Sequence, residues 1–259
     1  MRLPFFSLSA FSLVSAVLIL SSCDSSTNSN GSSSSNTTSG GGSSLGGATA
    51  SGTFTDSRDG QTYKWVKIGT QTWMAQSLNY KVDSSWCPDK DPTYCSAGYG
   101  RLYQWAAAMN LDTSYNNKHW QGSDSLKHQG ICPSGWHIPT DSEWGVLIAY
   151  VGIDSAGIKL KSISGWKDTA GNSAGNGTDK YSFNVLPSGT NGSTCFEDAK
   201  GNWSCGYRTI NIESIFLSAS ECKNDTEEVY NRWFGYGSTN SERGTMFKGH
   251  GLSVRCIQN

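Results

Sequence analysis

The sequence of 259 residues has few charges of either sign. Charged residues make up 16% of it, against about 25% in an ordinary soluble domain. Lys and Arg (20) nearly balance Asp and Glu (21), so the net charge is -1. Nucleic-acid-binding proteins need an excess of basic side chains to neutralise phosphates, so this balance argues against that class. The sequence also lacks a Gly-x-Ser-x-Gly nucleophile motif, a phosphate-binding loop and a dinucleotide fingerprint.

Glycine (30), tryptophan (10), tyrosine (11) and cysteine (8) are abundant instead. Few charges combined with many glycines, aromatics and cysteines are typical of an exported, loop-rich β or α+β domain. This composition argues against a helical bundle or a cytosolic enzyme. No internal repeat of about 20–50 residues occurs, which excludes solenoids and propellers.

The N-terminus has the pattern of an export signal. A short positive start at Arg2 is followed by an apolar run that ends in Leu20-Ser21-Ser22-Cys23. A leucine and two small residues before a cysteine resemble the bacterial lipoprotein signal. The resemblance implies that residues 1–22 are removed and that Cys23 carries a diacylglyceryl group. The alternative is an uncleaved transmembrane helix, since the run is marginally long enough to span a bilayer. No stop-transfer cluster follows it, which favours the lipid anchor.

Residues 23–52 predict a disordered tether. Nearly all of them are Ser, Thr, Asn or Gly, a composition that cannot build a core. Such a chain spans on the order of 30 Å, enough to lift a domain off the lipid headgroups. We expect one folded domain over residues 53–259, attached to the bacterial cell envelope at the outer membrane or cell surface. The membrane, reached through the lipid on Cys23, is the expected partner.

The folded part reads as α+β, with two short helices and irregular antiparallel strands between long loops. One helix is expected over 102–111 from apolar residues at i, i+3, i+4 and i+7. The second begins at a capping box of Thr140 and Glu143 and ends before Gly152. The expected strands are 63–68, 71–75, 181–186, 215–219, 229–234 and 252–257, the first two forming a hairpin.

Several phrases carry a family resemblance. The most specific is Cys132-Pro-Ser-Gly-Trp-His-Ile-Pro-Thr-Asp-Ser-Glu-Trp144, and the chain closes on Gly251-Leu-Ser-Val-Arg-Cys-Ile257. Together with 59–63, 68–75 and 99–109 these phrases resemble the Fibrobacter succinogenes major paralogous domain, a family of secreted and lipid-anchored bacterial proteins. A weaker resemblance, to formylglycine-generating (sulfatase-modifying) enzymes, implies a C-type-lectin-like fold with its termini joined by a strand pair. Neither resemblance assigns an activity.

Seven cysteines remain besides Cys23, in an oxidising setting. We expect disulfides within three pairs: Cys87 with Cys95, Cys195 with Cys205, and Cys132 with Cys256. Cys222 is then a buried thiol, a partner for one of the other six, or an intermolecular link. Other connectivities stay open at this stage.

Metal and cofactor sites are not expected. The histidines, at positions 119, 128, 137 and 250, are scattered, and no Cys-x-x-Cys occurs, which argues against zinc. The oxygen-rich residues Asp168, Asn172, Asn176 and Asp179 lack the EF-hand spacing, so a solvated loop is favoured over a calcium site.

Three functions compete for this chain. The favoured one is a non-catalytic surface module that binds a polysaccharide or surface glycan. Trp120, Trp203 and Trp233 stand in polar sequence and are the candidate ligand-facing aromatics, whereas Trp65, Trp105, Trp136 and Trp144 are expected in the core. The alternatives are an enzyme, either of the formylglycine-generating type with Cys222 as its loose thiol or carbohydrate-active, and a structural envelope protein.

Overall fold

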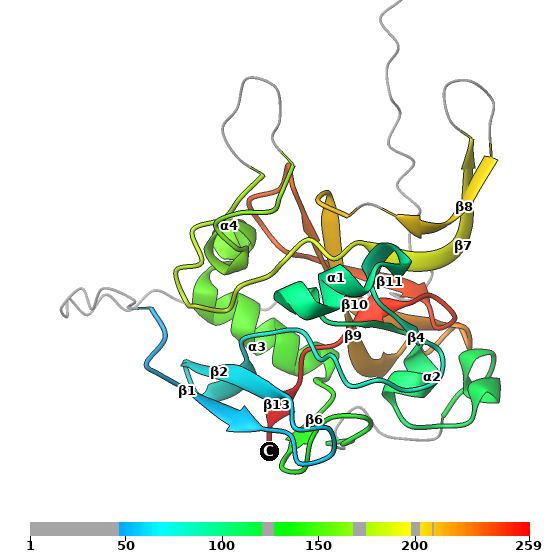
Figure 1. The fold of residues 1–259 in the computed structure, drawn as a ribbon, viewed down its shortest axis with the longest axis horizontal. Coiled ribbons are helices and arrows are strands. Elements are labelled where there is room, and N and C mark those ends of the chain that lie inside the picture. Colours follow the sequence, from blue (N-terminus) through cyan, green and yellow to red (C-terminus); the bar gives the residue numbers. More distant parts are fainter. Residues whose placement is uncertain (1–46, 121–126, 168–174, 198–202, 209) are drawn as a thin grey trace, which may run out of the picture.

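Two sheets of five and six strands and a separate hairpin form the domain (Figure 1). The structure is a computed structural model that describes residues 47–259 except 121–126, 168–174, 198–202 and 209. For residues 193–197 and 203–208 it describes the backbone alone. The five-stranded sheet runs β1 (Ala50–Thr55), β2 (Thr62–Ile68), β3 (Gln71–Met74), β13 (Ile257–Gln258) and β6 (Trp136–His137). The six-stranded sheet runs β11 (Glu242–Phe247), β10 (Glu228–Gly235), β9 (Glu213–Glu221), β12 (Leu252–Ser253), β5 (Leu102–Tyr103) and β4 (Ser85–Trp86).

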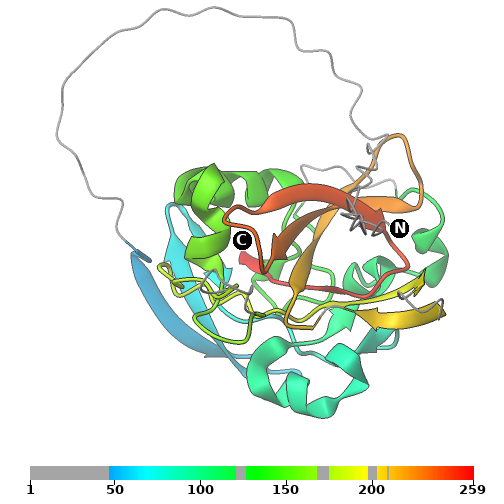
Figure 2. The ribbon, with the colours of Figure 1, turned by 90° about the horizontal axis from the view of Figure 1, so that it is seen from above.

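All strand pairs in the two sheets are antiparallel except β9 with β12, which confirms the expected α+β class. The separate hairpin, β7 (Thr190–Glu197) and β8 (Trp203–Arg208), projects from the rest of the domain (Figures 1 and 2). The α-helices are α1 (Pro92–Tyr94), α2 (Trp105–Ala108), α3 (Asp141–Val151) and α4 (Ala156–Leu160). Single turns of other helix types are η1 (Pro88–Lys90), η2 (Cys95–Tyr99), η3 (Thr113–Asn116) and η4 (Ile153–Ser155). Among the described residues, no helix has the length and apolarity needed to span a bilayer.

The helix α3 links the two sheets and forms as its sequence predicts. The Thr140 hydroxyl accepts the N–H of Glu143, and the Glu143 carboxylate accepts the N–H of Thr140, which confirms the capping box. Gly152, at φ 105°, ends the helix in a conformation open to glycine. Trp144 on the buried face packs 4.6 Å from the ring of Trp73 in β3 and 5.5 Å from that of Phe216 in β9. One core cluster therefore draws on both sheets and on α3.

The predicted hairpin of residues 63–68 and 71–75 is confirmed as β2 and β3. Ile68 pairs with Gln71 across a turn in which Gly69 has φ 59°. The sequence did not predict β1, which starts at Ala50, inside the range assigned to the tether. The strand β1 is held by antiparallel pairing with β2 along its whole length. The ring of Phe54 in β1 also stacks on that of Trp136, with the ring centres 4.7 Å apart.

Three predicted elements are wrong in extent or type. The expected helix 102–111 begins as strand β5, because Leu102 and Tyr103 pair with β12 and β4; only Trp105–Ala108 is helical. Residues 181–186 form no strand, because Ser182 and Asn184 both have φ 54°. The expected closing strand divides into β12 and β13, which belong to different sheets.

Of the expected core tryptophans, Trp105, Trp136 and Trp144 are buried and Trp65 is half-buried.

Candidate functional site

The residues of the most specific sequence phrase hold the C-terminus. His137 is buried, with its Nδ1 2.7 Å from Oδ1 of Asn259 and its Nε2 2.9 Å from Oε1 of Glu143. Burial alone would raise the pKa of Glu143, but hydrogen bonds from His137 and Thr140 outweigh it, so the pKa is lowered. A histidine–carboxylate pair could suggest acid–base chemistry. Here each of its polar atoms already has a structural partner.

Arg255, in the closing phrase, is likewise used inside the fold. Its guanidinium lies 4.4 Å from the ring of Phe183 and 5.1 Å from that of Phe216. It donates to the carbonyls of Phe183 and Asn184, and its Nε has no hydrogen-bond partner in the described part of the chain. Complete burial lowers the pKa of Arg255 to about 9. The side chain thus fixes the loop at 183–184 against β9.

A shallow pocket, the Trp86 pocket, brings together four segments that are distant in the sequence. Its volume is about 290 Å³. It is lined by Trp86 of β4, Gln104 before α2, Asn191 and Gly192 of β7, and Gly249 after β11. None of these described lining residues has a charged side chain. Its walls are neutral amides, backbone and one indole.

Close backbone packing builds the Trp86 pocket. A Cβ on Gly251 would lie 3.3 Å from Cε3 of Trp86, and one on Gly192 would lie 3.1 Å from the ring of His250. Asn191 and Gly251 exchange backbone hydrogen bonds, which joins β7 to the chain before β12. Nε2 of Gln104 donates to the Gly249 carbonyl at 2.9 Å. The side-chain amide of Asn191 has no partner among the described residues and faces this pocket.

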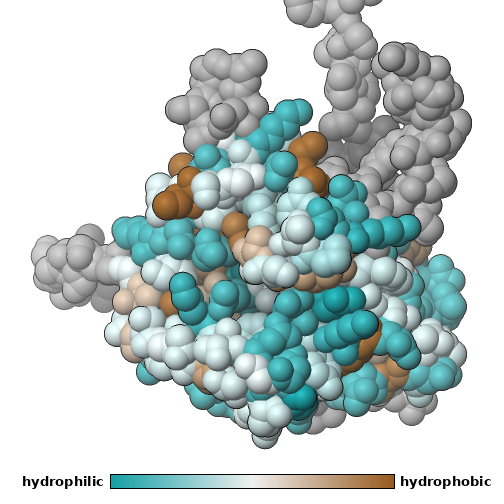
Figure 3. Space-filling view, viewed as in Figure 1, coloured by the Kyte–Doolittle hydropathy of each residue, from teal (hydrophilic) through white to brown (hydrophobic). Residues whose placement is uncertain are grey.

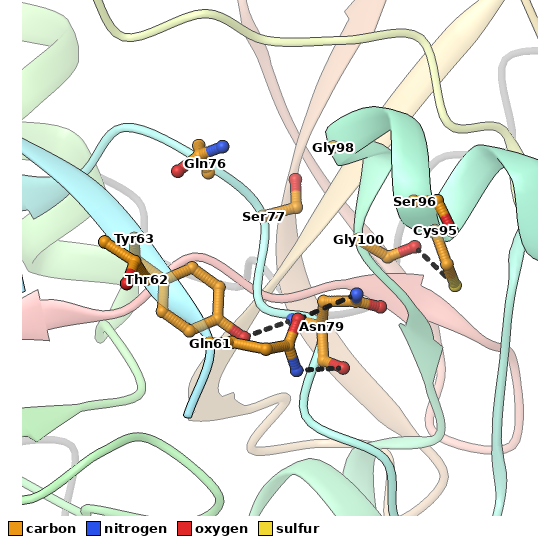
Figure 4. Close-up of a pocket in the computed structure, with 10 residues that line it drawn as sticks. All are labelled: Gln61, Thr62, Tyr63, Gln76, Ser77, Asn79, Cys95, Ser96, Gly98 and Gly100. Carbon is orange, nitrogen blue, oxygen red and sulfur yellow. Dashed lines mark hydrogen bonds between the residues drawn. The ribbon is translucent and has the colours of Figure 1, made fainter. Parts of the chain in front are cut away.

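A second, more enclosed pocket, the amide pocket, lies between the β2–β3 hairpin and η2 (Figure 4). Its volume is about 350 Å³. The polar side chains that line it are those of Gln61, Thr62, Gln76, Ser77, Asn79 and Ser96; Tyr63, Cys95, Gly98 and Gly100 complete the wall. Within the described part of the chain, this lining also contains no charged side chain. A cluster of three amides around one cavity is suited to an uncharged ligand that both donates and accepts hydrogen bonds.

The comparisons with known proteins agree with this architecture. A family model described as the Fibrobacter succinogenes major domain matches residues 66–258, which is more than half of the chain. The chain belongs to this family. No curated protein and no solved structure matches it. The match runs from β2 to β13 and so includes both pockets apart from Gln61, Thr62 and Tyr63.

Two of the predicted ligand-facing tryptophans, Trp120 and Trp233, lie apart in this structure. The N–H of Trp120 donates to Glu221 at one end of β9, and its ring packs 4.6 Å from His128. Nε1 of Trp233 donates to Glu213 at 2.7 Å, at the other end of β9. Those strand ends are roughly 25 Å apart at ~3.3 Å per residue. The backbone of Trp203 lies in β8, and its side chain is outside the described residues.

The disulfides Cys87–Cys95 and Cys132–Cys256 are present as predicted. Cys195 and Cys205 are directly opposed in the β7–β8 register, but their side chains are outside the described residues. Cys222 is buried and is disulfide-bonded, so it is no loose thiol. Cys23 also lies outside the described residues.

The loop considered for calcium is described only in part, because Asp168 and Asn172 lie outside the described residues. Asn176 accepts the N–H of Trp166 at 3.0 Å, and Asp179 accepts the N–H of Asn184 at 2.7 Å. Burial raises the pKa of Asp179. In the described ranges no three His, Cys, Asp or Glu side chains form a metal-binding cluster.

Sequence reasoning missed Trp86 and Asn191. Trp86 stands beside a cysteine in a short strand, and Asn191 starts a strand of small polar residues. Neither position has a local signal for a binding site, since the pocket arises only when β4, β7 and the chain after β11 meet. The amides of the second pocket were missed for the same reason.

Proposed function

We propose that this domain is a non-catalytic, lipid-anchored module of the cell envelope that binds neutral polysaccharide at the Trp86 pocket. One observation carries the proposal: among the described residues, the pocket is lined by an indole, an amide that has no side-chain partner there, exposed backbone and no charged side chain. Aromatic faces pack on the C–H faces of sugar rings, and amides donate to and accept from hydroxyls.

The shape of the Trp86 pocket suits the side of a polymer rather than a small enclosed ligand. It is shallow, and one wall is the backbone of Gly192 and Gly249. Phe247, 46% exposed, lies next to it along the chain and packs edge-on to His250. The face drawn in Figure 3 is largely hydrophilic, with apolar atoms in small separate groups. A hydrated polymer is a better match to such a surface than an apolar partner.

The non-catalytic assignment is supported by how the family phrases are used. His137 and Arg255 are buried and Glu143 is half-buried, each of them in structural contacts, and Cys222 is in a disulfide. We also propose a C-type-lectin-like topology, supported by β13 pairing with β3, which joins the end of the chain to its first sheet. A fold analogy of this kind carries no chemistry by itself.

The membrane attachment rests on the leader and Cys23. Metabolic palmitate labelling should mark the wild-type chain, and Cys23→Ser should lose the label. Equal labelling of both proteins would contradict a lipid on Cys23 and leave the transmembrane alternative.

The binding test uses the full mature chain, residues 23–259, with Cys23→Ser, which carries neither the apolar leader nor a lipid. Retention on cellulose, xylan and peptidoglycan is measured for this protein and for Trp86→Ala and Asn191→Ala. Loss of stacking and hydrogen bonds should weaken binding about tenfold (1.4 kcal/mol). Trp120→Ala, which removes another half-buried indole, is the matched control and should bind normally.

Two results would refute this function. Retention unchanged by Trp86→Ala and Asn191→Ala, or no retention on any polymer, would remove the Trp86 pocket as a glycan site. Release of reducing sugar during the same incubation would favour the carbohydrate-active enzyme instead.

A further inference from the structure

We infer that the amide pocket is a second, separate ligand site, which takes a single neutral sugar ring such as a chain end or a branch. This inference does not depend on binding at the Trp86 pocket, because the two pockets share no lining residue. The amide pocket has a rigid wall, and the described residues that line it include an amide N–H group without an acceptor there and no charged side chain.

The wall between Cys95 and Gly100 is held in place before any ligand binds. The Cys87–Cys95 disulfide closes it from one side. Arg101, next in the chain, donates from Nε to the Ser85 hydroxyl at 3.0 Å and from Nη2 to the Ser85 carbonyl at 2.8 Å. A Cβ on Gly100 would lie 2.6 Å from Cβ of Ser77, so the opposite wall touches it directly. A wall fixed in this way loses little entropy on binding.

The other wall is an ordered network that leaves groups unused. Nδ2 of Asn79 donates to Oε1 of Gln61 at 2.9 Å, and Nε2 of Gln61 donates to the Asn79 carbonyl at 3.1 Å. These bonds appear as dashed lines in Figure 4. Oδ1 of Asn79 is buried and has no donor among the described residues. Oε1 of Gln76 accepts the N–H of Lys64, while its Nε2 has no acceptor there.

The Gln76 side chain, which lines the cavity, has an Nε2 group left for a ligand. A hydroxyl of a bound sugar accepts from it, directly or through one water. Ionic ligands are disfavoured because none of the described residues that line the cavity has a charged side chain. A peptide is disfavoured because the lining offers little apolar surface for side chains. At about 350 Å³ the cavity is at the small end of ligand pockets, as a single ring requires.

The test blocks the amide pocket from its rim. Ser96 is exposed and lines the pocket, so Ser96→Trp places an indole in the cavity without touching the core. Ala97, its exposed neighbour, does not line the pocket, so Ala97→Trp is the matched control. The full chain with Cys23→Ser is titrated calorimetrically with glucose, galactose, xylose, N-acetylglucosamine and triglycine.

We expect millimolar binding of at least one sugar, weakened about tenfold or more by Ser96→Trp and unchanged by Ala97→Trp. Asn79→Ala should also weaken it. The same titration in Asn191→Ala should match the parent chain, which separates this site from the Trp86 pocket. No binding of any monosaccharide, equal binding in Ser96→Trp, or Ser96-dependent binding of triglycine alone would each overturn the inference.

Discussion

The Cys132–Cys256 disulfide gives a sharp quantitative test of the architecture. It joins the start of the family phrase to the residue before β13, with Cα atoms 6.0 Å apart and a sequence separation of 124. The perturbation is the double variant Cys132→Ala/Cys256→Ala. Alanine is chosen because both cysteines are fully buried, where a serine hydroxyl would need a partner.

The magnitude follows from loop closure in the unfolded chain. For a separation of 124 the chain-entropy relation gives about 5 kcal/mol, and for the separation of 8 between Cys87 and Cys95 it gives about 2.5 kcal/mol. The two double variants should therefore differ by roughly 2.5 kcal/mol in free energy of unfolding. The cavity left beside Trp136 and Met74 adds to the loss at the long-range bridge.

The assay is urea denaturation of the full chain with Cys23→Ser, followed by tryptophan fluorescence, for the parent and the two double variants. The variant without Cys87 and Cys95 is the matched control, since it also removes one disulfide. Equal losses of free energy of unfolding in the two variants would refute the reasoning that the Cys132–Cys256 bridge stabilises the fold more than the Cys87–Cys95 bridge. Non-reducing peptide mapping that finds Cys132 and Cys256 both alkylated would refute the bridge itself.

Two further predictions concern α3. Thr140→Ala should lower the free energy of unfolding by about 1 kcal/mol, measured by urea denaturation, because the N–H of Glu143 loses its acceptor. Ser142→Ala, at an exposed position of the same turn, should change it by less than about 0.5 kcal/mol, and an equal effect of both would show that Thr140 is not the cap. Because the pKa of Glu143 is lowered by folding, its carboxylate stabilises the folded state at pH values above its ordinary pKa of 4.5. This stabilisation is lost as the pH falls through the lower pKa of the folded state. Thermal melts from pH 6 to pH 3 should therefore show a smaller acid-induced loss in Glu143→Gln than in the parent, and parallel curves would contradict this.

Elements with local signals were predictable. The capping box, Gly152 and the apolar spacing after Trp144 fix α3 within one stretch of about a dozen residues. The turn at Gly69 fixes the β2–β3 hairpin in the same way. The short-range Cys87–Cys95 pair is also a local feature. In each case the interacting groups are close along the chain, so little depends on the rest of the fold.

Elements whose partners lie far along the chain were not predictable. The spacing at 102–111 is helical, yet Leu102 becomes strand because β12, some 150 residues away, supplies its hydrogen bonds. Tyr181, Phe183 and Val185 are buried in alternation as a strand requires, but Ser182 and Asn184 have left-handed backbone. Alternating burial alone therefore does not identify a strand when the backbone hydrogen bonds come from elsewhere.

The candidate site shows the same division. The sequence indicated an aromatic-rich, weakly charged domain without a familiar catalytic motif, and composition is sufficient for that statement. Trp120 and Trp233 were predicted to face a ligand because their sequence neighbours are polar. In the folded domain they lie at opposite ends of β9. Only the tertiary structure selects Trp86, because only there do Asn191 and Gly249 meet an indole.

The sequence by itself determined the class of the domain, its family phrases, the start and end of α3 and the β2–β3 hairpin. Those features depend on composition or on contacts between near neighbours, whose energies are set by local chemistry. The tertiary structure decided which sheet each short strand joins, which polar groups of the family phrases are consumed by the fold, and where the two uncharged pockets lie. These outcomes depend on pairings over a hundred residues apart, such as Gln104 with Gly249 and Tyr103 with Leu252, which no local pattern encodes.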